Sequence, residues 1–92
     1  MKLDRSLTPK WHRNCSLELA PDRKGHVLHL SPGGMIRLDA DDARVSELID
    51  GRHTVEEIIE TLHTRFPNLP ETGMDVDRFM KVASEKQWID LH

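Results

Sequence analysis

Cysteine, aromatic residues and long apolar runs are all scarce in this sequence of 92 residues. Cys15 is the only cysteine, which excludes an internal disulfide and suits a reducing compartment. No apolar run approaches the length that spans a membrane, and the first residues lack the apolar stretch of a signal peptide. We therefore expect a cytoplasmic protein that does not insert into a membrane.

An excess of basic charge is missing as well. The chain has 13 Lys and Arg against 16 Asp and Glu, a formal net charge of −3. Phosphate contacts from Lys and Arg supply most of the non-specific affinity for DNA, so the composition argues against a nucleic-acid partner. With 37% hydrophobic and 32% charged residues, the chain fits one small soluble domain. Such a domain has a small core, so a ligand or partner chain that adds buried area would stabilise it.

Motifs of catalysis and metal binding are absent too. The sequence has no glycine-rich phosphate loop between a strand and a helix, no nucleophile with an evident base, and no His-x-x-x-His pair. His26 and His29 fall on opposite faces of a predicted strand, so they cannot ligate one ion together. We therefore predict a binding module that is not an enzyme and holds no cofactor or metal. Cys15 is expected to be a small inward residue.

The most strongly patterned stretch is a helix predicted over residues 55–66. Thr54 is placed to cap its first turn, and Glu57 to reach back to the cap. A helix with one apolar stripe is not stable alone, so the flanking segments must bury that stripe. Five apolar residues recur at helical spacing and make up the stripe: Val55, Ile58, Ile59, Leu62 and Phe66.

The segments before this helix alternate with a period of two. Residues 1–14 are polar, and we predict an irregular arm there, with Trp11 as its one large apolar group, so that the folded domain spans residues 15–92. The alternation predicts short strands at 15–20, 26–30 and 35–38, separated by turns at 21–25 and 31–34. The first two should pair as a hairpin. The third should point Ile36 and Leu38 inward.

Two further helices complete the prediction. The first starts after Asp39 as the cap and ends at Asp50-Gly51, with Ala43 or Val45, Leu48 and Ile49 inward. A loop is expected at 67–73, and residues 88–91 form an apolar tail. The last helix carries Val76, Phe79, Met80, Ala83 and Gln87 on its inward face. The predicted fold class is α+β and winged helix-turn-helix-like, with three short N-terminal antiparallel strands followed by three helices.

That topology raises DNA binding as a candidate function. The last helix, which would enter a major groove, carries equal numbers of acidic and basic side chains: Asp75, Asp77 and Glu85 against Arg78, Lys81 and Lys86. No face of the predicted fold has the basic excess that DNA binding requires. The charge pattern therefore weakens this candidate.

Peptide binding fits the predicted sheet better, because three strands leave two edges with unpaired backbone groups. Such an edge is either protected or used. If residues 35–38 form an edge strand, an extended peptide can pair with its backbone while peptide side chains pack against a neighbouring helix. The alternative is an edge that is covered within the chain or paired with a second copy in a homodimer.

Short segments spread from about Trp11 to the C-terminus carry a resemblance to a known family. They include Lys24-Gly25-His26-Val27-Leu28, Pro32-x-Gly34-Met35-Ile36-Arg37-Leu38, Leu48-Ile49-Asp50-Gly51, Val55-x-x-Ile58-Ile59-x-x-Leu62, Arg65-Phe66-Pro67 and Trp88-Ile89. Together they are similar to the PqqD family of pyrroloquinoline quinone (PQQ) biosynthesis. The conjunction of Gly34-Met35 with Lys86-Gln87-Trp88-Ile89 is the most specific part of the resemblance.

The resemblance implies a peptide chaperone of the RiPP recognition element class, which performs no chemistry itself. Family members bind the precursor peptide PqqA and present it to the radical-SAM enzyme PqqE. In the wider family the peptide adds as a strand to the third strand, in a groove bordered by the third helix. Carried over to this sequence, the pairing strand would be Met35, Ile36, Arg37 and Leu38, and the groove wall Arg78, Lys81, Val82 and Lys86, with the basic groups meeting peptide carboxylates.

One departure from the family pattern keeps an alternative open. Ser31-Pro32-Gly33 stands where the family has Tyr-Pro-Glu, and the sequence contains no tyrosine. The alternative is a leader-peptide recognition protein of another ribosomal-peptide modification pathway.

Overall fold

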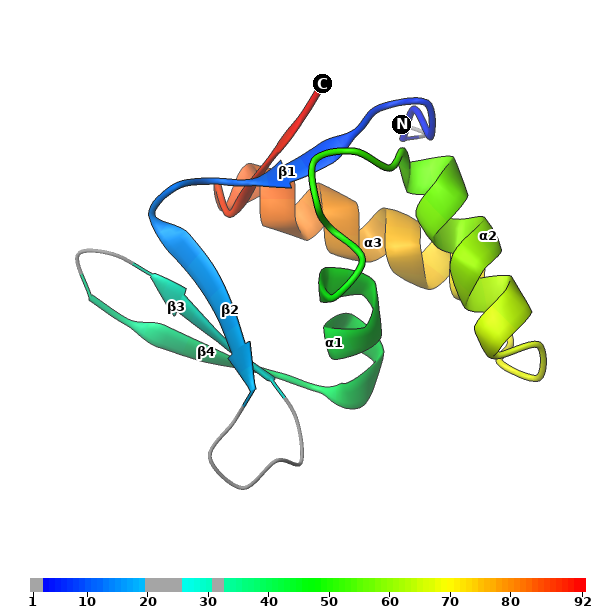
Figure 1. The fold of residues 1–92 in the computed structure, drawn as a ribbon, viewed down its shortest axis with the longest axis horizontal. Helices are drawn as coiled ribbons and strands as arrows, with labels where there is room; N and C mark the ends of the chain where they lie inside the picture. The colour runs from blue at the N-terminus through cyan, green and yellow to red at the C-terminus, as the bar shows by residue number, and fades with distance from the viewer. Residues whose placement is uncertain (1–2, 20–25, 31–32) are drawn as a thin grey trace.

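The structure is a computed structural model that describes residues 3–19, 26–30 and 33–92. Its elements in order are β1 (Pro9–Trp11), β2 (Cys15–Leu19), β3 (His26–Leu30), β4 (Met35–Leu38), α1 (Ala40–Ser46), α2 (Val55–Arg65), α3 (Thr72–Glu85) and β5 (Ile89–Leu91). In Figure 1 the sheet of β2, β3 and β4 lies on one side, α2 on the other, and α1 between them. The predicted α+β order of three strands and then three helices is confirmed. The turn predicted at 21–25 and part of that at 31–34 lie outside the described residues.

The core forms where the inward faces of the sheet and the helices meet. Leu28 of β3, Ile58 of α2 and Met80 of α3 are all buried, and so is Ile89 of β5. The predicted stripe of α2 is confirmed, since its residues from Val55 to Leu62 pack in this cluster and Phe66 packs at its margin. The inward faces of helices and strands thus follow from periodicity alone.

The N-terminal arm is not irregular throughout, which corrects the prediction. β1 pairs antiparallel with β5, with Pro9 opposite Leu91 and Trp11 opposite Ile89. The segment after α3 that was predicted as an apolar tail is therefore a strand. Each of these strands is three residues long, too short for an alternating pattern to appear, and each depends on a partner at the opposite end of the chain.

The arm also completes the N-terminus of α2. The carbonyl oxygens of Leu7 and Arg5 accept hydrogen bonds from the first and second amides of α2, at 2.9 Å each. The predicted capping box is confirmed: the Thr54 hydroxyl accepts from the Glu57 amide at 3.1 Å, and the Glu57 carboxylate accepts from the Thr54 amide at 2.8 Å. All the amides that a helix leaves open in its first turn are satisfied here.

The Arg5 side chain ties the same arm to α3. Its guanidinium donates two hydrogen bonds to Asp77, at 2.9 and 3.2 Å, and this carboxylate raises the pKa of Arg5. A Cβ at position 73 would lie 3.0 Å from the Arg5 Nη2 atom, so the glycine at position 73 leaves room for the Arg5 guanidinium beside Asp77. The arm is therefore held against both α2 and α3.

Two helix boundaries differ from the prediction. Asp39 caps α1 as expected, accepting from the Asp42 amide at 2.8 Å, but α1 ends at Ser46 and not at Gly51. The chain after Ser46 continues in tighter turns, closed by the bond from the Ile49 amide to the Ser46 carbonyl at 3.2 Å. The second boundary that differs is the start of α3, which lies at Thr72, inside the loop predicted at 67–73.

Gln87 lies outside α3 and is exposed, so its prediction as an inward residue of that helix was wrong. It has φ +62°, in the left-handed region. The Trp88 amide donates to the Ala83 carbonyl at 2.8 Å, and the Gln87 amide donates to the Ser84 carbonyl at 3.1 Å. This pair of bonds is the Schellman arrangement that ends many helices, and glycine is its preferred residue at the left-handed position.

We expect Gln87→Gly to raise the free energy of unfolding by about 0.5–1 kcal/mol, because glycine adopts positive φ without steric cost. Denaturation in urea measures the change. The matched control is Lys86→Gly, one residue earlier, where φ is −85° and glycine should destabilise. Equal destabilisation by both variants would contradict a left-handed turn at position 87.

Candidate functional site

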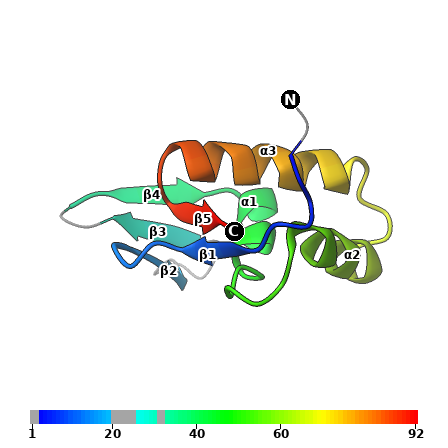
Figure 2. The same ribbon diagram turned by 90° about the horizontal axis from the view of Figure 1, so that it is seen from above.

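A groove of about 270 Å³ lies between β4 and α3, and we call it the β4–α3 groove. Figure 2 shows α3 running alongside β4 in the opposite chain direction. The groove combines an apolar wall with charged side chains. Its lining residues are Ile36, Arg37, Leu38, Asp39, Asp41, Asp42, Asp75, Arg78, Phe79, Val82 and Trp88.

β4 is an edge of the three-stranded sheet, whose strand order is β2-β3-β4. The Leu30 amide donates to the Gly34 carbonyl at 3.0 Å, which fixes the phase of the antiparallel hydrogen bonds between β3 and β4. Because bonded and non-bonded pairs alternate along such a ladder, the residues two and four positions after Gly34 direct their backbone groups to β3. The backbone groups of Met35 and Arg37 therefore point to the outer edge, beside the groove.

The structure brings five of the eight predicted site residues to this groove. Ile36, Arg37 and Leu38 line it from β4, and Arg78 and Val82 line it from α3. The other three are not among its lining residues. Met35 is 68% exposed at the start of β4, Lys81 is exposed on α3, and the Lys86 ammonium lies 5.9 Å from the centre of the Trp88 ring, which lines the groove.

Sequence reasoning missed the other side chains of the groove. Phe79 is a core residue, as predicted, and Trp88, which was predicted to lie in an apolar tail, is buried in the same core. Both also line the groove, which was not predicted. Three of the four aspartates come directly after β4, a signal that is visible in the sequence, but the prediction used only Asp39, as a helix cap. Asp75 reaches the same place only because α3 passes α1 in space.

The aspartates give one end of the groove a negative character. Asp41 pairs with Arg44 at 2.7 Å, and Asp75 lies 3.9 Å from Arg78. Partial burial raises the pKa of Asp42, and repulsion from the other three aspartates raises it further. Unfavourable negative charge thus gathers where β4 leads into α1.

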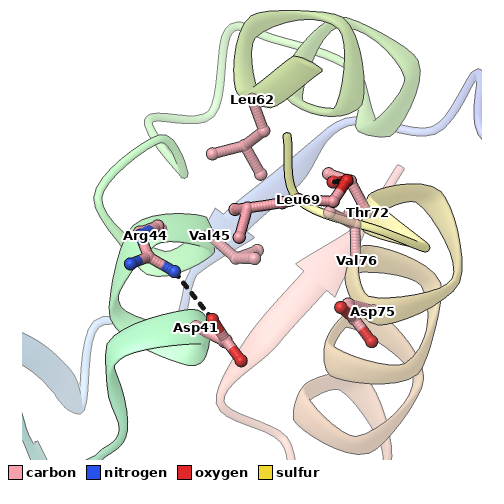
Figure 3. Close-up of a pocket in the computed structure, with 8 residues that line it drawn as sticks. All are labelled: Asp41, Arg44, Val45, Leu62, Leu69, Thr72, Asp75 and Val76. Carbon is pink, nitrogen blue, oxygen red and sulfur yellow. Dashed lines mark hydrogen bonds and ion pairs between the residues drawn. The ribbon is translucent and has the colours of Figure 1, made fainter. Parts of the chain in front are cut away.

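Two other hollows are less suited to a ligand. A cavity of about 30 Å³ lies where α1, α2 and α3 meet (Figure 3), with room for about one water molecule. Arg44 closes it from α1 and stacks on Phe66 at 4.9 Å from the ring centre. A hollow of about 370 Å³ on α2 is lined by polar side chains only: His53, Glu57, Glu60, Thr61, Thr64 and Arg65. Neither offers an apolar wall beside a strand edge.

The described His and Cys side chains do not form a metal site. No group of three His, Cys, Asp or Glu able to hold a metal occurs among the described residues. His26 pairs with Glu47 at 2.8 Å and His29 with Glu18 at 3.0 Å. Cys15 is buried as predicted, and burial raises the pKa of its thiol. In the described part of the chain, no helix is long and apolar enough to cross a membrane.

Comparison with known proteins agrees with this arrangement. Residues 24–89 match the family described as Coenzyme PQQ synthesis protein D (PqqD). A PqqA binding protein of Pseudomonas syringae pv. syringae (strain B728a) is 52% identical over 87 residues, covering 95% of this chain and 92% of that protein. A PqqA binding protein of Pseudomonas fluorescens (strain Pf0-1) is 45% identical over 91 residues, covering 99% of each.

A solved structure shares the fold. The solution NMR structure of the PqqD truncation of Methylobacterium extorquens PqqCD, described as a stand-alone RiPP recognition element, superposes with a TM-score of 0.72. It is 25% identical and the match covers 89% of this chain and 87% of that one. The sheet, with β4 at its edge, and the three helices thus have the fold of a RiPP recognition element. The chain belongs to the PqqD family, as the resemblance predicted.

Proposed function

We propose that this chain binds the precursor peptide PqqA of PQQ biosynthesis by strand addition to β4, and that it presents the bound peptide to the radical-SAM enzyme PqqE. The observation that carries the proposal is an edge strand lying next to an apolar groove. Membership of the PqqD family and relatives named PqqA binding proteins support the choice of peptide.

The geometry of β4 suits an extended peptide. Its four residues span about 13 Å at the usual rise of a strand, so about four peptide residues can pair with it. Backbone groups of Met35 and Arg37 face the incoming strand, and alternate peptide side chains would pack on Phe79, Val82 and Trp88. Backbone bonds then give affinity, and the groove selects side chains.

Basic side chains of α3 and of the residue that follows it would give a further contribution. Lys81 and Lys86 are exposed on the α3 side and Arg78 lines the groove, so peptide carboxylates that lie outside the apolar wall would meet these cations. Such contacts are partly exposed to solvent and contribute little each. They adjust affinity and do not replace the backbone pairing.

Strand addition also explains how a protein without chemistry of its own serves a modifying enzyme. β4 holds only a short segment, so the peptide on both sides of that segment extends beyond the groove. PqqE would then act on residues that are not in contact with this chain. The chain acts as a peptide chaperone and performs no catalysis.

Titration with the precursor peptide encoded beside the gene of this chain tests the proposal. We expect saturable one-to-one binding whose affinity falls only modestly with salt, because backbone pairing and apolar contacts dominate. A scrambled peptide of the same composition is the matched control. Failure of the precursor to bind, or equal binding of the scrambled peptide, would overturn the proposal, and binding of another pathway's leader peptide in its place would favour that pathway.

A further inference from the structure

We propose that residues 5–12 of the N-terminal arm act as a strap that holds α3 in the position where the β4–α3 groove accepts a peptide, with Arg5 as the positioning residue. The inference rests on the proposed function, because the groove is where the peptide would lie. Neither Arg5 nor its partner Asp77 is among the residues that line the groove. An effect of Arg5 on peptide affinity therefore passes through the position of α3.

Arg5 holds α3 on the side that faces away from the groove. Its guanidinium donates to both carboxylate oxygens of Asp77, at 2.9 and 3.2 Å, although the two residues are 72 positions apart in the sequence. At 3.6 residues per turn, Asp77 lies roughly 150° around the helix axis from the mean direction of the α3 residues that line the groove. Those residues are Asp75, Arg78, Phe79 and Val82.

The buried side of α3, which includes Val76 and Met80, lies between these two directions. A roll of α3 about its buried side would separate Asp77 from Arg5 and would move Val82 relative to β4 at the same time. The ion pair opposes this roll, because a bidentate contact between a guanidinium and a carboxylate fixes direction as well as distance. The contact behind α3 thus helps to set the distance between the two walls of the groove.

The strap also holds the groove at the C-terminal end of α3. The His12 amide donates to the Trp88 carbonyl at 2.9 Å, and Trp88 lines the groove. β5 begins at the next residue and pairs with β1, and Thr8 and His92 exchange two backbone hydrogen bonds at 2.7 and 3.1 Å. Figure 1 shows β1 beside the C-terminal segment. One short segment is therefore tied to both ends of the helix that forms a wall of the groove.

The contacts of the strap are few and partly exposed to water. β1 and β5 have three residues each, Pro9 has no amide to donate, and the Arg5 side chain is 37% exposed. Chain ends held in this way open locally more often than the whole domain unfolds. While the strap is open, the peptide meets a groove that is less pre-organised, so its affinity falls. By linkage, bound peptide favours the closed strap by the same factor.

Removing either partner of the ion pair tests the strap. Arg5→Ala and Asp77→Asn should each weaken binding of the precursor peptide by roughly two- to fivefold, the range of one partly exposed ion pair. The double variant should lose no more than either single variant, because both changes break the same contact. The matched control is Ile58→Val, which destabilises the core and should leave the affinity of the folded protein unchanged. Circular dichroism checks that each variant is folded.

Hydrogen exchange of the parent chain tests the reciprocal effect without any substitution. The Glu56 amide donates to the Arg5 carbonyl at 2.9 Å, and the His92 amide donates to the Thr8 carbonyl at 3.1 Å. Neither Glu56 nor His92 is among the residues that line the groove. Saturating peptide should slow exchange at both amides by roughly two- to fivefold, because the strap opens less often in the complex.

Four results would overturn the strap. They are a folded Arg5→Ala variant with parental affinity, additive losses in the double variant, an equal loss of affinity in Ile58→Val, and exchange at the Glu56 and His92 amides that does not respond to bound peptide. In each of these cases the parent chain still binds its peptide, so the proposed function stands. Absence of binding by the parent chain would instead overturn both proposals.

Discussion

Arg37→Pro will weaken peptide binding by at least about 1 kcal/mol, whereas Arg37→Ala will weaken it only slightly. The backbone of residue 37 points to the outer edge of β4, so proline removes an amide at the position where the peptide strand pairs. One lost net hydrogen bond costs about 1 kcal/mol, and the proline ring adds a steric obstacle to the incoming strand. Isothermal titration with the precursor peptide measures both variants.

The comparison is informative because both variants remove the same side chain. Arg37→Ala keeps the amide and reports the contribution of the Arg37 side chain, so the difference between the variants reports the lost amide together with the proline ring. Circular dichroism and thermal unfolding confirm that the proline variant is folded, as expected for proline on an edge strand whose amide faces away from the sheet. A folded proline variant with parental affinity would show that the peptide does not pair with β4.

Ile58→Ala will lower the free energy of unfolding by about 2–5 kcal/mol, enough to leave much of this small domain unfolded. Ile58 is 1% exposed and lies at the centre of the core, where α2 packs against its neighbours. Truncation removes buried apolar area and leaves a cavity. Urea denaturation monitored by tryptophan fluorescence measures the loss.

Ile58→Val is the graded control and should cost about 0.5–1.5 kcal/mol. Ile58 does not line the β4–α3 groove, so the folded fraction of either variant should bind the precursor with parental affinity. Saturating peptide should then raise the melting temperature of the destabilised variant, because the peptide binds only the folded state. A melting temperature that is insensitive to bound peptide would contradict this linkage.

The sequence predicted those parts of the fold that depend on local patterns. The apolar stripe of α2, its cap at Thr54, and the strands β2, β3 and β4 are all set by neighbours within a few residues of each other. The end of α1 was misplaced because Ile49 is buried in a turn, where a helical pattern continues without a helix. The spacing of apolar residues reports which side chains are buried, and a buried residue such as Ile49 does not have to lie in a helix.

Features that depend on distant parts of the chain were outside the reach of pattern analysis. The pairing of Trp11 with Ile89 joins the two ends of the chain, and no local signal predicts it. The groove, too, combines features that local patterns predict with features that they do not. Ile36 and Leu38 were predicted as inward residues of β4 from the alternating pattern. The approach of Asp75 to the start of α1 follows only from the packing of α3. Edge status, too, is a property of the complete sheet.

The location of amide shift changes on adding the precursor peptide tests the central claim most directly. With uniformly labelled protein, we expect the largest changes at Met35 and Arg37 on β4, and further changes along the groove side of α3 at Arg78 and Val82. New protection of the Met35 amide from solvent exchange should accompany them. Changes confined to the outer face of α2, with β4 unaffected, would contradict strand addition at this edge.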